Sequence, residues 1–374
     1  MSRQPIWARL RRVTLVALAL GGIGCIVAAL DDAAAFFPGW LAAVVLWVGL
    51  PLAALTLVLV HDLTGGRWKA TARPVFEAAI ATLPIVTLAF LPVLAGLSHL
   101  YLWSRPGAPA LANSFYLERG FFIARYVLYF VIWNALAVYA LRWPRDDGAG
   151  APAAISWASG VGLVLLGFSV SFAAIDWVLS LAPTFWSSIF GMIFGAGAFN
   201  TGVALMLLVI ALRGPALARL DPVHHDNLAD LAAILLATTI FWAYVEFCQF
   251  LIIWEENLHS EIPWYLRRMA GAWGAVMYAV AAAGFFLPFL VLLWRPSKRS
   301  GAVVAGTCVL ILAARLLNVW WWILPEFPDV GFGWVDIACI AALGGLVMLV
   351  FGQYLHWSRL PALLSRAVEE GPRG

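Results

Sequence analysis

Long runs of apolar residues, separated by short polar stretches, follow one another along the whole chain. Ten such runs occur, and a helix rising about 1.5 Å per residue crosses about 30 Å of hydrocarbon within each of them. They cover about residues 13–30, 39–60, 76–98, 118–141, 153–179, 186–212, 228–254, 268–294, 301–323 and 334–355. A membrane β-barrel would instead need alternating segments of about 10 residues, which this sequence lacks. The pattern predicts an all-α polytopic membrane protein, with residues 1–374 forming a single integral membrane domain.

The composition agrees with this prediction and excludes several classes of protein. Hydrophobic residues make up 63% of the 374 residues and charged residues only 11%, whereas a soluble domain carries roughly a quarter of its residues as Asp, Glu, Lys or Arg. A soluble enzyme and a disordered chain are therefore both excluded. The net charge of +3 is too small to indicate a nucleic-acid partner.

The distribution of basic residues predicts how the chain crosses the membrane. Most of the 23 Lys and Arg residues lie at the two ends of the chain and in every second connection, whereas the other connections carry only Arg105, Arg267 and Arg268. Because Lys and Arg accumulate in short cytoplasmic loops, both termini are expected in the cytoplasm. The first apolar run is longer than that of a usual signal peptide, so it is expected to remain as the first helix.

Four charged side chains fall inside the predicted spans, near their outer ends. They are Arg125, Asp176, Glu246 and Arg315, and counting at about 1.5 Å per residue places all of them within about 12 Å of the extracytoplasmic surface. A charge inside a span costs at least about 2.5 kcal/mol, so each is expected to be paired or functional. Further polar residues at this level or on the same helix faces are His99, Gln249 and Asn318.

Two interpretations of this polar layer remain open. In the first, the charges form two buried pairs, Arg125–Asp176 and Glu246–Arg315, that only fix helix packing. In the second, the layer conducts protons or binds quinol, because a buried carboxylate can accept a proton and an amide or imidazole can hydrogen-bond a quinol headgroup. The proton or quinol contacts would then be Asp176, Glu246, Gln249, His99 and Asn318, with Arg125 and Arg315 as counter-charges.

The sequence offers no ligand set for a redox centre. Its four cysteines are isolated from one another, without the paired spacing that metal binding or haem attachment requires. Among the six histidines, only His99 and His259 are expected on the same outer side, and His259 falls in an acidic loop, so a bis-histidine haem is not expected. The chain is expected to bind no cofactor except a quinone and not to be catalytic alone.

Two segments at the outer ends of the spans carry the most specific pattern. Residues 176–191 bridge the fifth and sixth runs, and residues 247–268 link the seventh and eighth. Both resemble signatures of the ActF-type membrane subunits of bacterial alternative complex III, a quinol:cytochrome c oxidoreductase, and more distantly the NrfD-type quinol-binding subunits. Matching residues include Asp176, Trp177, Ser180 and Pro183 in the first segment and Gln249, Trp254, Asn257, Pro263 and Trp264 in the second.

The match is incomplete at four positions. Ala182 and Thr184 stand where the family has an acid and a histidine, and His259 and Ser260 also depart from its pattern. Any role that the family assigns to those side chains is therefore not carried over to this chain.

The resemblance implies a place in a respiratory complex of the bacterial inner membrane. The implied partners are a homologous ten-helix membrane subunit, an iron–sulfur subunit, c-type cytochrome subunits and a terminal oxidase. Haem c and the iron–sulfur clusters belong to those partners. This chain would contribute a quinol-binding or proton-conducting layer near the periplasmic side.

Two other functions fit the residues without the resemblance. Intramembrane charges on ten helices also suit an ion-coupled secondary transporter, although the sequence shows no clear pair of broken helices at matching positions. Alternatively, the chain is a structural anchor subunit whose buried charge pairs only set how the helices pack.

Overall fold

The protein is an all-α polytopic membrane protein, as the pattern of apolar runs predicts. The computed structural model describes residues 4–65, 68–107, 114–142, 153–212 and 224–357. Helices make up 87% of the structure, and the described part contains no strand. In chain order the elements are α1 (Gln4–Asp31), α2 (Ala33–Trp47), α3 (Gly49–Thr64), α4 (Trp68–Ile80), α5 (Leu83–Ala89), α6 (Leu91–Ala95), α7 (Leu97–Leu100), η1 (Leu102–Ser104), α8 (Arg119–Arg142), α9 (Ala153–Trp177), η2 (Leu179–Leu181), α10 (Phe190–Leu212), α12 (His224–Glu256), α13 (Ile262–Met269), α14 (Gly271–Ala281), η3 (Ala282–Phe286), α15 (Leu287–Leu293), α16 (Arg295–Arg299), α17 (Gly301–Ile323), η4 (Leu324–Glu326) and α18 (Trp334–Trp357).

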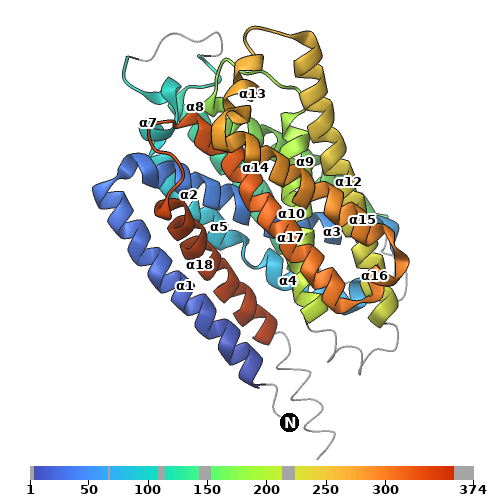
Figure 1. The fold of residues 1–374 in the computed structure, drawn as a ribbon. Coiled ribbons are helices and arrows are strands. Elements are labelled where there is room, and N and C mark those ends of the chain that lie inside the picture. Colours follow the sequence, from blue (N-terminus) through green and yellow to red (C-terminus); the bar gives the residue numbers. More distant parts are fainter. Residues whose placement is uncertain (1–3, 66–67, 108–113, 143–152, 213–223, 358–374) are drawn as a thin grey trace, which may run out of the picture.

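All ten predicted spans are confirmed as helical stretches long and apolar enough to cross a membrane. They are Arg11–Asp31, Ala33–Thr64, Ala72–Ala95, Arg119–Arg142, Ser156–Leu181, Phe190–Leu212, Asn227–Glu256, Gly271–Leu293, Gly301–Glu326 and Trp334–His356. The second span begins earlier than predicted because Asp32 caps it, accepting a hydrogen bond from the backbone N–H of Ala35 at 3.1 Å. The start of α1 and the end of α18 lie at the same end of the bundle (Figure 1).

Prolines explain where the spans are interrupted. A proline has no N–H to donate, and its ring crowds the carbonyl one turn earlier. Helix α2 therefore ends at Trp47, one turn before Pro51, and α4 ends at Ile80, one turn before Pro84. The other proline-linked irregularities are the break between α5 and α6 before Pro92 and the π-helical turn η3 before Pro288.

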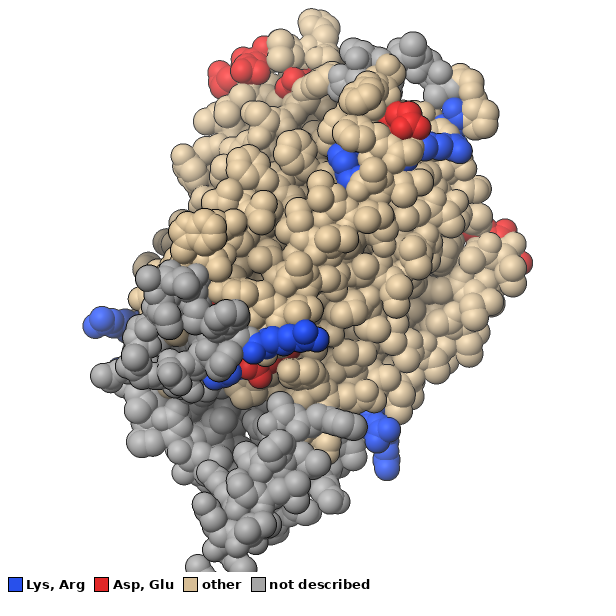
Figure 2. Space-filling model, turned by 180° about the vertical axis from the view of Figure 1, so that it is seen from behind, with Lys and Arg blue, Asp and Glu red and all other residues tan. Residues whose placement is uncertain are grey.

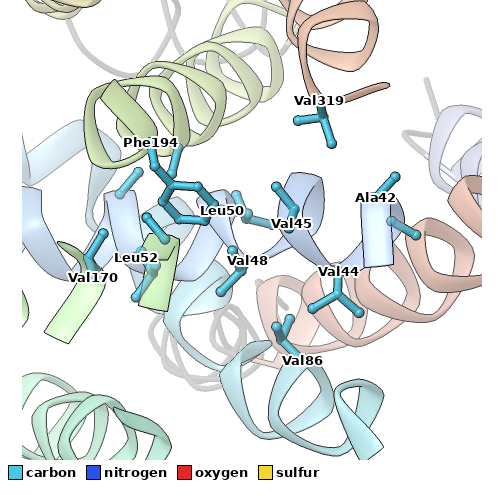
Figure 3. Close-up of a cluster of buried hydrophobic side chains, with 14 of the residues drawn as sticks. Ala42, Val44, Val45, Val48, Leu50, Leu52, Val86, Val170, Phe194 and Val319 are labelled. Carbon is cyan, nitrogen blue, oxygen red and sulfur yellow. The ribbon is translucent and has the colours of Figure 1, made fainter. Parts of the chain in front are cut away.

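Helix α10 forms the centre of the bundle. It packs against α3, α9, α12 and α17, and apart from Asn200 and Thr201 its residues are apolar or small on every side, which is typical of a helix surrounded by other helices. Figure 3 shows Phe194 of α10 together with Leu50 and Val319 in the cluster of buried apolar side chains. Helix α10 comes closest to α3 at Gly202, where a Cβ atom would overlap the carbonyl of Gly49.

Helices α1 and α18 lie side by side at the edge of the bundle (Figure 1). Glycine makes this possible, because a Cβ on Gly345 would lie 2.7 Å from the backbone nitrogen of Leu18. Small residues at helix interfaces are the usual means of close packing in lipid, where no hydrophobic force drives helices together. The free thiols of Cys25 and Cys339 also meet here, with their sulfur atoms 3.8 Å apart.

The surface has the polarity expected of a membrane protein. Figure 2 shows Lys, Arg, Asp and Glu gathered toward the two ends of the molecule, with a broad surface free of charged atoms between them. Many large apolar side chains on the described helices are exposed. In a bilayer this band faces hydrocarbon, which is consistent with an integral membrane protein.

One glycine substitution tests the packing at the centre of the bundle. Gly202→Ala would place a methyl group against Ala53 and the backbone of Gly49, neither of which can rotate away, so the free energy of unfolding should fall by about 1–3 kcal/mol. Gly306→Ala in α17 is the matched control, because its Cβ would meet open space. Thermal unfolding in detergent compares the two variants, and equal melting temperatures would contradict the close α10–α3 contact.

Candidate functional site

The first predicted charge pair is present, and every polar atom of its carboxylate has a partner. Arg125 of α8 donates from Nε and Nη2 to the two oxygens of Asp176 on α9, at 2.8 and 2.9 Å. Tyr129 donates its hydroxyl to Asp176 Oδ2 at 2.8 Å, and Arg125 Nη1 donates to the carbonyl of Tyr116 at 2.8 Å. Both charged side chains are buried. This network joins α8 to α9 and leaves neither carboxylate oxygen unbonded.

The segment that follows Asp176 is held by hydrogen bonds to its own backbone. Ser180 donates its hydroxyl to the Asp176 carbonyl at 2.5 Å, and Tyr101 donates to the carbonyl of Trp177 at 3.0 Å. Burial, and then the charge of Asp176, raise the pKa of Tyr101 well above its usual range, so its hydroxyl keeps the proton it donates. Pro183, half-buried, follows the short η2 turn in the link between α9 and α10.

The two segments that carry the family resemblance lie against each other. Ser187 of the first donates its hydroxyl to Gln249 Oε1 of the second at 2.6 Å. Phe185 stacks on Trp264, with ring centroids 4.6 Å apart and planes inclined by 10°. The sequence predicts that both segments lie on the outer side of the membrane. The structure shows that they also contact each other.

Other residues of the second segment shape its backbone. Asn257 directly follows α12 and has a φ of +50°, a left-handed conformation that Asn tolerates better than most residues and that ends helices. Pro263 stands in the first turn of α13, where its missing N–H costs no helical bond. Trp254 is 47% exposed, as expected of a ring at the membrane surface. Asn257, Pro263 and Trp254 therefore each have a local structural role that accounts for their presence in the second motif segment.

The second predicted pair does not form, so the expectation of a Glu246–Arg315 ion pair is wrong for this structure. No ion-pair contact joins the two side chains in the described part of the chain. Arg315 lies instead over the ring of Trp242, with Cζ 3.4 Å from the ring centroid. Trp242 precedes Glu246 by one turn on the same face of α12, and its indole takes the position facing the guanidinium.

Glu246 and Arg315 both retain unbonded polar atoms. Oε2 of Glu246 is buried without a hydrogen-bond partner, and so are all three nitrogens of the Arg315 guanidinium. The indole N–H groups of Trp242 and Trp322 lie near the Glu246 carboxyl but fail the geometry of a hydrogen bond to it. Buried polar groups in folded proteins are nearly always bonded, so a cluster of unbonded ones marks a site for water, an ion or chemistry.

A small cavity lies against Arg315. It encloses about 10 Å³ between α2, α10 and α17, room for about one water molecule. Asn318, the remaining polar residue predicted on α17, is 2% exposed, lines this cavity and has an unbonded Oδ1 atom. The structure therefore brings Asn318 and Arg315 together, and Glu246 lies near both Arg315 and Trp242 without lining the cavity.

His99 does not join either charged group. It is exposed, and its ring stacks on Phe37 with centroids 4.9 Å apart. His259 is exposed as well. Across the described ranges, no group of three or more His, Cys, Asp or Glu side chains is placed to hold a metal ion.

Arg268 is a buried charge that escaped the sequence analysis, which assigned it to an outer connection. Arg268 is fully buried and donates to the carbonyls of Trp264, Trp321 and Trp322 at 2.7–3.0 Å. It also pairs with Glu326 at 2.9 Å and lies 3.6 Å above the Trp264 ring. Carbonyls at the end of α17 lack intrahelical partners, and the guanidinium supplies them. The signal available in the sequence was the spacing of Trp264 and Arg268, one turn apart on a short helix.

Arg268 remains positively charged although it is buried. Burial lowers the pKa of Arg268 to about 10, and the Glu326 carboxylate limits the fall. The guanidinium is therefore charged at neutral pH, as a cap on a helix C-terminus requires. At the acidic end of the same connection, burial and the charge of Glu256 raise the pKa of Glu261.

Asp176→Asn should destabilise the protein strongly. The substitution removes the charge that compensates buried Arg125, so the free energy of unfolding should fall by about 3–5 kcal/mol. The double variant Arg125→Met/Asp176→Leu, which removes both charges, should recover most of this loss. Chemical unfolding in detergent measures all three proteins. A single variant as stable as the wild type would show that the pair does not hold α8 on α9.

Two adjacent arginines provide a matched test of the α17 cap. Arg268→Gln leaves the carbonyls at the end of α17 without a cation and should lower the free energy of unfolding by about 3 kcal/mol or more. Arg267→Gln removes a half-exposed partner of the same Glu326 and should cost at most about 1 kcal/mol. Melting temperatures of the two variants compare them directly, and similar losses would refute the capping role.

Comparison with known proteins gives no family assignment. The chain matches no protein-family model, and no curated protein matches it in sequence. A function for this multi-pass membrane protein therefore has to follow from its own residues and contacts.

Proposed function

We propose that this chain is an integral membrane subunit of a quinol-oxidising respiratory complex in the bacterial cytoplasmic membrane. The support is the contact between the two segments that resemble alternative complex III: Ser187 bonds Gln249, and Phe185 stacks on Trp264. The two motif segments lie some sixty residues apart in the sequence. Their contact in the structure makes the resemblance to the family more specific than two separate matches would. Gln249 lies one helical turn from Glu246, so this unit adjoins the unbonded charges.

Within that layer we assign proton exchange to Glu246. A group that gains and loses a proton needs a site for that proton, and Oε2 of Glu246 has no hydrogen-bond partner. Asp176 has every oxygen occupied by Arg125 and Tyr129, so its contribution is to hold the helices. Arg315 supplies positive charge near Glu246 without neutralising it by contact.

A quinol contact would lie elsewhere than the Arg315 cavity. About 10 Å³ admits a water-sized occupant and excludes an aromatic ring. The proposed quinol contacts are therefore Gln249, which is buried at the junction of the two segments, and His99, which is exposed at the outer end of the third span. Both can hydrogen-bond a quinol oxygen.

Electron transfer belongs to partner subunits in this proposal. By the family resemblance these are a homologous ten-helix membrane subunit, an iron–sulfur subunit, c-type cytochromes and a terminal oxidase. Purification of the tagged chain in mild detergent should yield these proteins together, with haem bands that quinol reduces. A colourless, solitary chain would contradict the assignment to such a complex.

The second candidate, an ion-coupled transporter, gains support from the interrupted helices. The second, third and eighth spans are broken at Val48, at residues 81–82 and at the π-helical turn η3, and transporters bind ions where helices unwind. The isolated chain in liposomes separates the two functions. Uptake driven by an ion gradient would favour the transporter.

The proton role is tested at Glu246. Glu246→Gln keeps the size of the side chain and removes its titration, so quinol-dependent proton release by the assembled complex should fall by about 10-fold or more. Glu255→Gln is the matched control, since Glu255 is exposed on the same helix. The measurement is the rate of quinol oxidation and of proton release in reconstituted vesicles, since a quinol loses its protons together with its electrons. Normal release in the Glu246 variant would remove Glu246 from the proton path.

A further inference from the structure

The guanidinium of Arg315 has the least satisfied environment among the buried charges of the described ranges. It is 2% exposed, and Nε, Nη1 and Nη2 all lack a hydrogen-bond partner. Arg125 and Arg268, by contrast, donate to carboxylates and backbone carbonyls. A cation removed from water without partners is among the most costly arrangements in a protein, so a partner of another kind is expected.

The cation–π contact between Arg315 and Trp242 does not provide a hydrogen-bond partner for the guanidinium. Trp242 covers one face of the guanidinium with its ring, 3.4 Å from Cζ, and a cation–π contact leaves the N–H groups free because they point outward in the plane of the guanidinium. Glu246 is the carboxylate whose charge acts on Arg315, but it makes no contact with the guanidinium and does not line the cavity.

The cavity beside Arg315 is lined by groups that donate hydrogen bonds. Arg315 and Asn318 supply its polar lining, whereas Trp322 turns its six-membered ring toward Gly197 and its indole N–H lies near Glu246. The Asn318 amide supplies two further N–H donors. The other lining residues are apolar or small: Val45, Leu46, Phe194, Gly197, Ala198, Thr201 and Val319. A positive charge with convergent N–H donors and apolar walls suits an anion.

We propose that this cavity binds one small monovalent anion of halide size as the counter-ion of Arg315. The volume of about 10 Å³ has room for about one water-sized occupant, and a halide ion is close to that size. The anion accepts hydrogen bonds from Arg315 and from the Asn318 amide and compensates the charge of the guanidinium. This inference holds whether or not the chain belongs to a quinol-oxidising complex.

Gly197 controls the space for the anion. A Cβ at this position would lie 3.1 Å from Arg315 Nη1 and 3.5 Å from the Trp322 ring, so Gly197→Ala fills the cavity without altering any charge. Gly195, also on α10, offers the matched control because its Cβ would meet only Val170, at an ordinary contact distance of 3.5 Å.

Bromide is the probe for this site, because its anomalous scattering identifies it directly. Crystals of the full chain grown with sodium bromide should show an anomalous peak next to the Arg315 guanidinium. Density for water alone in the cavity, with no anomalous signal, would overturn the proposal. This measurement uses the wild-type protein and does not depend on the stability of any variant.

Thermal stability in detergent gives a second test. At constant ionic strength, replacing gluconate by bromide should raise the melting temperature of the wild type saturably, by about 2 °C or more. Gly195→Ala should keep this shift, and Gly197→Ala should lose it. An equal shift in all three proteins would mean that halide acts elsewhere, and the absence of any shift in the wild type would also contradict the site.

Discussion

The hydrocarbon core of a membrane supplies no hydrogen-bond partners, so each charged side chain placed there must be satisfied by the bundle itself. Arg125 meets this requirement with the carboxylate of Asp176 and the carbonyl of Tyr116. Arg268, at the outer edge, meets it with Glu326 and the last carbonyls of α17. These contacts join α8 to α9 and α13 to α17, and the need to satisfy each charge therefore also fixes the positions of the helices.

Arg315, unlike Arg125 and Arg268, has only part of its hydrogen-bonding and charge requirement satisfied by the bundle. Its positive charge rests on the ring of Trp242, its N–H groups have no acceptor, and Glu246 stays out of contact. Proteins keep unsatisfied groups of this kind mainly where they bind or react with something. The proton role proposed for Glu246 and the anion site proposed at Arg315 both rest on this one incomplete arrangement.

At one end of the bundle, contacts between the ends of the spans form a continuous structure beside this layer. Ser187 bonds Gln249, and Phe185 stacks on Trp264, whose ring in turn lies under Arg268 at the end of α17. Spans five to nine are thereby tied together on one side of the membrane.

The sequence by itself determined the all-α architecture and the ten spans, because these depend on apolar run length and on the rise per residue. It also supplied the Arg125–Asp176 pair. Only the tertiary structure decided that Glu246 and Arg315 do not pair and that Arg268 is buried. Pairing depends on how each helix is rotated about its axis and on which side chain fills the intervening space, here the indole of Trp242. A one-dimensional count gives the height of a residue in the membrane and says nothing about that rotation.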